Sequence, residues 1–180
     1  MFRYLKKISM GRGAWLLMLI ITSGLQISAL FFQHVLNMQP CVLCIYQRTA
    51  LYGVLLASII GLIAPKSLLI RLLAISTWLY SAAYGMSFSW QHVRLQFYSS
   101  PLDTCDLFPI FYFNIKWDEI VPVIFKASGN CSDKLGTILG LEMSQWMLII
   151  FSAYFIVGLA VLCSQIVKVK AQKAIFSFKK

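Results

Sequence analysis

Charged side chains are scarce in this 180-residue sequence, and acidic ones are the scarcest of all. Only 12% of the residues are charged and six are Asp or Glu, whereas 59% are hydrophobic and the mean hydropathy is +0.76. An ordinary soluble domain is roughly one quarter charged. The composition therefore excludes an ordinary soluble domain.

A basic helix and an aromatic RNA-binding motif are also absent, although the net charge is +10. The basic residues lie at the ends and joints of apolar segments. Nucleic-acid binding is therefore disfavoured, and the positive charge indicates membrane topology.

Four segments contain almost no charge, and Arg48 is the single exception. We predict membrane spans at about 14–32, 42–64, 72–90 and 145–163, each long enough to cross a ~30 Å hydrocarbon core as a helix. The first span exceeds the ~7–15 apolar residues of a signal peptide, so it is expected to be retained. The predicted fold is an all-α membrane protein: one integral-membrane domain over 1–180, built as a four-helix transmembrane bundle.

The charge asymmetry predicts the orientation of these spans. Segments 1–13, 65–71 and 164–180 hold eleven basic and no acidic residues, whereas all six acidic residues lie within 91–144. The positive-inside rule therefore places both termini in the cytoplasm and the loops 33–47 and 91–144 outside. In a bacterial inner membrane that outer side is the oxidising periplasm, where disulfides persist.

Cys41 and Cys44 form a CxxC pair where the second span begins. If Cys41 opens a helix, both thiols share one face near the positive end of the helix dipole, which suits a redox dithiol. A zinc site would need a second closely spaced ligand pair, and the sequence lacks one, so no metal is expected. Arg48 shares the same helical face; it is either a functional charge or a residue snorkelling to the interface.

Cys105 and Cys131 lie in the long loop 91–144. They suit either a structural staple or an exchangeable redox disulfide, and the residues alone do not decide between the two. Between them, the spacing of Trp117, Ile120 and Ile124 predicts a short helix on the membrane surface. Pro122 fits such a helix only near its start.

Other residues carry weaker predictions. His92 lies at the depth of the CxxC pair and is either an interfacial histidine or a neighbour of the reacting thiols; His34 is a weaker candidate. Cys163 is interpreted as a small apolar filler. The aromatic residues at span ends are interpreted mostly as interface anchors: Trp15, Tyr46, Trp78, Trp90 and Trp146.

The pattern as a whole resembles the disulfide bond formation protein B (DsbB) family of the bacterial inner membrane. The resemblance extends over segments 11–17, 40–46 with Arg48, 61–66, 78–82, 127–131 and 140–146, and so over nearly the whole chain. It implies a four-helix enzyme that reoxidises a DsbA-like periplasmic thioredoxin-fold protein. The electrons would pass to a membrane quinone, either ubiquinone or menaquinone, and so sustain disulfide formation in secreted proteins.

The resemblance also implies roles for individual residues. Cys41 and Cys44 match the pair next to the quinone, with Cys44 making the sulfur contact. Cys105 matches the loop cysteine that the reduced partner attacks, and Cys131 matches its companion. Arg48 matches the arginine that supports quinone reactivity.

His92 falls where the family often has a histidine near the quinone. Two features depart from the family pattern. Gln47 stands where some members have an acidic residue, and the stretch 107–115 beside Cys105 is divergent, which affects the choice of partner.

Two other functions remain open. One is a four-helix reductase that resembles vitamin K epoxide reductases. The other is a non-catalytic scaffold or small transporter with structural disulfides, which the spans support poorly because only Arg48 could line a polar pathway.

Overall fold

The computed structural model describes residues 2–98, 120–125, 127–132 and 137–166. The elements follow in the order α1 (Phe2–Ser9), α2 (Arg12–His34), α3 (Val42–Ile63), α4 (Leu68–Phe97), α6 (Pro122–Phe125), β1 (Thr137–Ile138), β2 (Leu141–Glu142) and α7 (Met143–Ile166). Four of the helices, α2, α3, α4 and α7, are long and apolar enough to cross a membrane. The predicted all-α, four-helix membrane bundle is confirmed.

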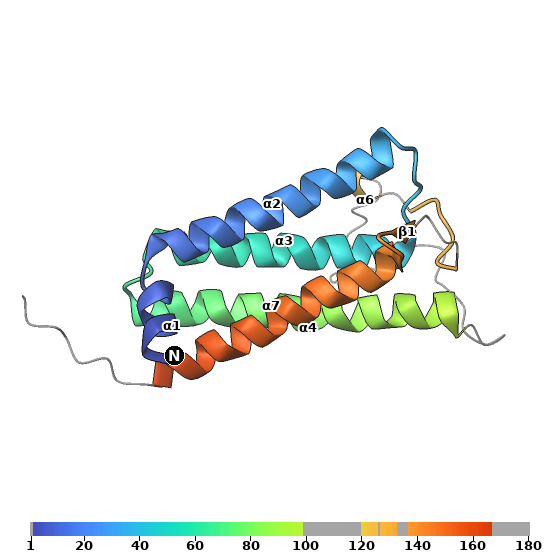
Figure 1. Ribbon diagram of the computed structural model, residues 1–180. Helices are drawn as coiled ribbons and strands as arrows, with labels where there is room; N and C mark the ends of the chain where they lie inside the picture. Colours follow the sequence, from blue (N-terminus) through green and yellow to red (C-terminus); the bar gives the residue numbers. More distant parts are fainter. Residues whose placement is uncertain (1, 99–119, 126, 133–136, 167–180) are drawn as a thin grey trace, which may run out of the picture.

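The four long helices alternate in direction along one bundle (Figure 1). α3 packs most extensively against α4, α4 packs against α7, and α2 packs against α3. The end of α2, the start of α3, the end of α4 and the start of α7 meet at one end of the bundle, together with α6 and the two short strands (Figure 1). We call this the cysteine end, because Cys41 and Cys44 lie there.

α4 extends well beyond the apolar segment from which its span was predicted. It runs for 30 residues, because the polar stretch after Trp90 continues the helix. Hydropathy marks where a helix crosses hydrocarbon and not where its hydrogen bonds end. His92 therefore lies inside a regular helix, which fixes its position against α3.

The centre of the bundle is close-packed around small residues. A Cβ atom on Gly85 of α4 would lie 2.2 Å from the ring of Phe151 on α7, so only glycine allows this approach. Trp15 and Trp78 are buried in the core, with ring centroids 6.3 Å apart and an edge-to-face geometry. The prediction that these two tryptophans are interface anchors is therefore wrong.

The opposite end of the bundle contains a helix that was not predicted. α1 packs against α7, and its Lys6 Nζ donates a hydrogen bond to the backbone oxygen of Gln165. Arg71 of α4 donates to the side chain of the same glutamine. Cys163, near this end, is exposed on α7, so its interpretation as a buried filler is wrong.

The short elements at the cysteine end partly match the predicted surface helix. α6 begins at Pro122, because the fixed φ angle of proline suits the first turn of a helix. Trp117, which belonged to the predicted helix, lies outside the described residues. β1 and β2 form a small antiparallel hairpin that was not predicted, with positive φ angles at Leu139 and Gly140 in its two-residue turn.

Candidate redox site at the cysteine end

Cys41 and Cys44 stand at the start of α3, as the CxxC spacing predicted. Cys41 is the N-cap residue, and its sulfur accepts a hydrogen bond from the backbone N–H of Cys44 at 3.3 Å. The two Sγ atoms are 3.0 Å apart, and both residues carry free thiols. One helical turn thus brings the two sulfurs together in the geometry needed to form or open a disulfide.

The two thiols have different surroundings. Cys41 is 1% exposed, whereas Cys44 is partly exposed and lines a cavity. The hydrogen bond that Cys41 donates to Cys44, together with burial, raises the pKa of the Cys41 thiol. Cys41 therefore keeps its proton, and Cys44 is the sulfur presented to a reactant.

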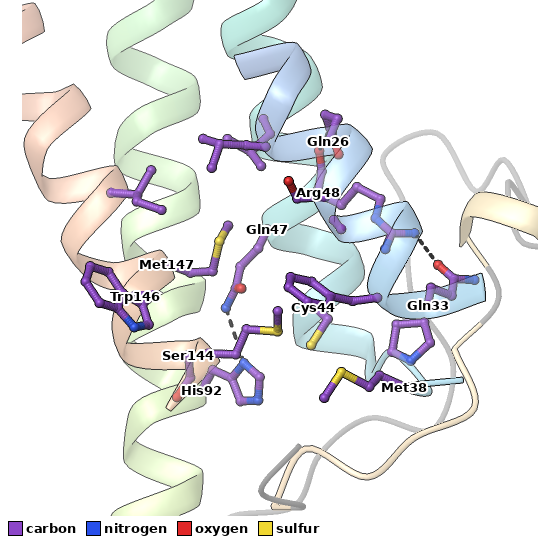
Figure 2. A pocket seen from close by; sticks show the side chains of 18 of the residues that line it. Gln26, Gln33, Met38, Cys44, Gln47, Arg48, His92, Ser144, Trp146 and Met147 are labelled. Carbon is purple, nitrogen blue, oxygen red and sulfur yellow. Dashed lines mark hydrogen bonds between the residues drawn. The ribbon is translucent and has the colours of Figure 1, made fainter. Parts of the chain in front are cut away.

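His92 reaches the CxxC pair from α4. Its Nε2 atom lies 3.7 Å from Cys41 Sγ, and its Nδ1 atom lies 3.3 Å from the side-chain nitrogen of Gln47 (Figure 2). The side-chain nitrogen of Gln96 lies 3.4 Å from the same Nε2 atom. Gln47, which departs from the family pattern, thus helps to position the His92 ring from α3.

Arg48 lies one turn deeper than Cys44 and is only 6% exposed. Its Nη1 atom donates to the side-chain oxygen of Gln33 and to the backbone oxygen of Ile124, both at 2.7 Å. Figure 2 shows the first of these bonds between α3 and α2. Both acceptors are uncharged, so they hold the guanidinium in place without neutralising its charge.

A cavity of about 280 Å³ adjoins Cys44 at this end of the bundle. Its walls come from α2, α3, α4 and α7 and are mainly apolar, with Leu25, Phe32 and Met147 among them (Figure 2). The polar groups Cys44, Arg48 and His92 also line it. The cavity can take a mostly apolar ring with a few polar atoms.

Two buried acceptor atoms in this lining have no hydrogen-bond partner among the described residues. They are Oε1 of Gln26, whose Nε2 donates to the backbone oxygen of Arg48, and Oε2 of Glu142. Buried polar atoms are normally paired. Two residues of the lining, Gln26 and Glu142, therefore each have a polar atom that the described residues leave unpaired.

The loop segment 127–131 brings Cys131 to the CxxC pair. The backbone N–H groups of Ser128 and Gly129 donate to the backbone oxygen of Pro40 at 3.0 and 3.1 Å. A Cβ on Gly129 would lie 2.4 Å from the backbone oxygen of Gln39, so glycine permits this close contact.

Cys131 is 1% exposed, is disulfide-bonded, and packs in one apolar cluster with Cys41. Cys105 lies outside the described residues.

The structure brings together three possible metal ligands that do not all lie close together in the sequence. The ligand atoms of Cys41, Cys44 and His92 lie within 4.8 Å of one another. The prediction that zinc is absent considered only closely spaced ligand pairs. Cys41 and His92 are 51 positions apart, so their spacing in the sequence gives no such signal. The expectation of a metal-free site remains a prediction.

Several lining residues were missed by the sequence analysis. They are mostly amides and hydroxyls within or beside the apolar helices: Gln26, Gln33, Gln47, Gln96 and Ser144. Gln26 and Gln33 are seven positions apart and so share one face of α2. Polar residues that recur on one face of an apolar segment were the available signal.

Comparison with known proteins gives the family. The family model described as "Disulfide bond formation protein DsbB" matches residues 11–161. A curated relative named "Disulfide bond formation protein B" from Yersinia pestis (strain Pestoides F) is 48% identical over 170 residues, covering 94% of this chain and 96% of the relative. A relative of the same name from Escherichia coli O1:K1 / APEC is 50% identical with the same coverage.

The match of the family model covers all of α2, α3 and α4 and most of α7, and it includes the CxxC pair, Arg48, His92 and Cys131. The chain therefore belongs to the DsbB family of membrane disulfide bond formation proteins.

Proposed function

We propose that this protein is a thiol:quinone oxidoreductase that reoxidises a DsbA-like periplasmic thioredoxin-fold protein and passes the electrons to a membrane quinone. The observation that carries the proposal is the placement of one sulfur, Cys44, in the wall of an apolar cavity while its partner Cys41 packs in one cluster with Cys131. The pair thus adjoins both a second disulfide and a site for a small apolar oxidant.

The first step belongs to the long loop. The thiolate of the reduced partner attacks a Cys105–Cys131 disulfide at Cys105, forms a mixed disulfide there and releases Cys131 as a thiolate. Cys131 is disulfide-bonded while Cys41, Cys44 and Cys163 are free, which supports that pairing. A second thiolate of the partner then resolves the mixed disulfide and leaves both loop cysteines reduced.

The second step transfers the reducing equivalents to the CxxC pair. Cys131 attacks an oxidised Cys41–Cys44 disulfide at Cys41, which packs in the same cluster, and Cys44 leaves as the thiolate. Cys105 then attacks the Cys131–Cys41 mixed disulfide, restores the loop disulfide and leaves Cys41 as a thiol. The cysteines described with free thiols, Cys41 and Cys44, correspond to the state that follows this exchange.

The third step takes place at the cavity, where a quinone would accept two electrons and two protons. The residues fit that group: Leu25, Phe32 and Met147 would hold a ring, and polar side chains would meet its oxygens. Arg48 holds a fixed positive charge beside Cys44 and stabilises negative charge on the thiolate and on a ligand oxygen. His92 faces Cys41 and would be the imidazole nearest the ligand.

An acceptor of high potential gives the relay its direction. A DsbA-like protein is a strong oxidant with a potential of about −120 mV, so its dithiol gives up electrons reluctantly. Each ~30 mV changes a two-electron equilibrium tenfold. A ubiquinone or menaquinone dissolved in the bilayer would supply that driving force, and no metal is required.

We place the protein in the bacterial inner membrane as a multi-pass protein with both termini in the cytoplasm. The cysteine end, with loops 33–47 and 91–144, would face the periplasm. The basic segments at the opposite end support this orientation.

The alternative function, a scaffold with structural disulfides, has less support. A structural role would need stable bridges, whereas Cys41 and Cys44 are free and lie beside a cavity. A reductase resembling vitamin K epoxide reductases would use the same pair, and it would differ in the substrate that accepts the electrons.

The test is anaerobic quinone reduction by the purified protein in detergent, supplied with a reduced DsbA-like protein and followed by the loss of quinone absorbance. Wild type should turn over, and both Cys44→Ser and Cys105→Ser should abolish turnover. Cys163→Ser is the matched control and should retain it. Absence of turnover in wild type with ubiquinone and menaquinone, and disulfides inert to the partner, would refute the proposal.

A further inference from the structure

One carboxyl group in the wall of the cavity has no role in the steps above. Glu142 ends β2 immediately before α7, is 7% exposed, and lines the same cavity as Cys44 and Arg48. Its Oε2 atom is buried without a hydrogen-bond partner among the described residues. It is also the only acidic residue in the part of the chain that the structure describes.

The fold alone gives an incomplete reason for this carboxyl group. A negative charge before the start of α7 interacts favourably with the helix dipole. The backbone N–H of Glu142 donates to the side chain of Gln145 at 3.0 Å, which fixes the backbone at the helix start. Neither contact satisfies Oε2, and an unpaired buried carboxyl oxygen is costly. Glu142 therefore has a carboxyl oxygen without a partner among the described residues, beside the cavity that Cys44 lines.

We propose that Glu142 holds and delivers one of the two protons that the acceptor in this cavity requires. This inference rests on the proposed function and adds a proton-donating residue to it. A protonated carboxyl donates a hydrogen bond, whereas a carboxylate only accepts. Glu142 can thus donate to a quinone oxygen before the reaction and accept from the quinol hydroxyl afterwards.

The step balances with the groups already assigned. A sulfur–sulfur bond forms between Cys41 and Cys44, while the S–H bond of Cys41 and the O–H bond of Glu142 break. Two electrons leave the sulfur pair, and the two protons form the two O–H bonds of the quinol. The negative charge that began on Cys44 ends on Glu142, which then takes a proton from water at the outer face.

The position of each proton fits this account. Cys41 donates its hydrogen bond to Cys44, so its proton points at the sulfur that lines the cavity. Glu142 enters the cavity from a different element, at the start of α7, where the hairpin β1–β2 meets the bundle. The two protons therefore come from α3 and from the start of α7, which suits an acceptor with two separate oxygens.

The experiment uses pre-reduced protein in detergent, mixed anaerobically with a short-chain ubiquinone. The single-turnover rate of thiol oxidation is followed over a range of pH for wild type, Glu142→Gln and the control Glu119→Gln, which makes the same substitution at another position of loop 91–144. Quinone binding is measured separately by quenching of tryptophan fluorescence. Infrared spectra of the reduced proteins, compared between wild type and Glu142→Gln, report the C=O band of a protonated carboxyl group.

Glu142→Gln should slow thiol oxidation about 10²-fold at neutral pH, within the range for loss of a general acid. Its rate should fall further as the pH rises, in proportion to the proton concentration, because water must then supply the proton. Cys44, Arg48 and His92 also line this cavity, but they are common to all three proteins, so the difference between profiles isolates Glu142. The carboxyl band should disappear, and quinone binding and reduction by the partner should be preserved.

Three outcomes would overturn the inference. An unchanged rate and pH profile in Glu142→Gln, or an unchanged carboxyl band, would show that this residue holds no transferred proton. Equal losses of quinone binding, partner reduction and rate would show a structural role only. If wild type itself fails to oxidise its thiols with quinone, the proposed function is wrong as well. If wild type is active and Glu142→Gln oxidises its thiols at the same rate, only this inference is wrong.

Discussion

At the scale of single residues, the two neighbouring thiols of the site differ in their surroundings. Cys41 is enclosed and hydrogen-bonded to Cys44, whereas Cys44 opens onto the cavity. One turn further along α3, Arg48 supplies a positive charge that protein contacts position but do not neutralise. Along the start of α3, the enclosed sulfur of Cys41 therefore comes first, the cavity-lining sulfur of Cys44 second and the charge of Arg48 third.

Arg48→Ala should slow quinone reduction about 10²–10³-fold, the range for loss of one preorganised donor. Binding of the DsbA-like partner should be nearly unaffected, because the partner acts at the loop cysteines. The measurement is the rate of quinone absorbance loss beside the rate at which the partner reduces the loop disulfide. Equal quinone reduction by variant and wild type would rule out the role given to Arg48.

The raised pKa of Cys41 predicts unequal alkylation of the two thiols. A thiol with a raised pKa stays protonated to higher pH, so Cys41 should react with iodoacetamide more slowly than Cys44 at neutral and mildly alkaline pH. Peptide mapping by mass spectrometry would measure both sites, with exposed Cys163 as the reference. Faster modification of Cys41 than of Cys44 would contradict the assignment.

At the scale of elements, docking of the loop onto the start of α3 brings Cys131 beside the CxxC pair. Segment 127–131 is hydrogen-bonded to Pro40, and α6 is hydrogen-bonded to Arg48 through Ile124. Tyr52 and Phe125 add a ring contact between α3 and α6 at 6.2 Å. The loop therefore contacts the same few residues that carry the CxxC chemistry.

Gly129→Ala should weaken this docking, because its Cβ would lie 2.4 Å from a backbone oxygen that cannot move away easily. Electron transfer between the cysteine pairs should slow several-fold, while pre-reduced protein should still reduce quinone at the wild-type rate. Single-turnover experiments started from either pair would separate these two rates. Gly24→Ala of α2 is the matched control, since nothing lies within 4 Å of the Cβ that it adds. Wild-type transfer in Gly129→Ala would mean that this contact is not needed.

The same elements show what the sequence could and could not predict. The four long helices and the CxxC pair at a helix start follow from hydropathy and short spacing, which are local properties. The approach of His92 to the CxxC pair, and the place of Glu142 in the wall of the same cavity, depend on how segments far apart in the sequence pack, and no local pattern encodes it. Trp15 and Trp78 were misplaced for a related reason: an aromatic residue near a span end suits either the interface or the core, and packing decides.

At the scale of the whole molecule, charge is distributed between the two ends of the bundle. Lys6 and Lys7 of α1, Lys66 of the connector before α4 and Arg71 in the first turn of α4 lie at one end, and Glu142 lies at the cysteine end. Because the long helices alternate in direction, each end of the bundle lies on one side of the membrane. One orientation therefore decides the compartment of every redox cysteine.

Single cysteines placed in a cysteine-free variant would test this orientation. A cysteine at Lys66 should be blocked from a membrane-impermeant maleimide in intact spheroplasts, and one at Leu139 of the exposed hairpin turn should be labelled. Permeabilised cells serve as the control in which both positions react. The reverse labelling pattern would invert the proposed topology.

The two hydrogen bonds of Arg48 have a consequence for its replacement by lysine. Both described bonds use Nη1, one to α2 and one to α6, so a single nitrogen anchors two elements. A lysine ammonium keeps the charge but has only one nitrogen for every contact. Arg48→Lys would thus face a conflict between holding the loop and serving the cavity. In the proposed mechanism, one guanidinium group both holds α2 and α6 in place and stabilises negative charge at the cavity.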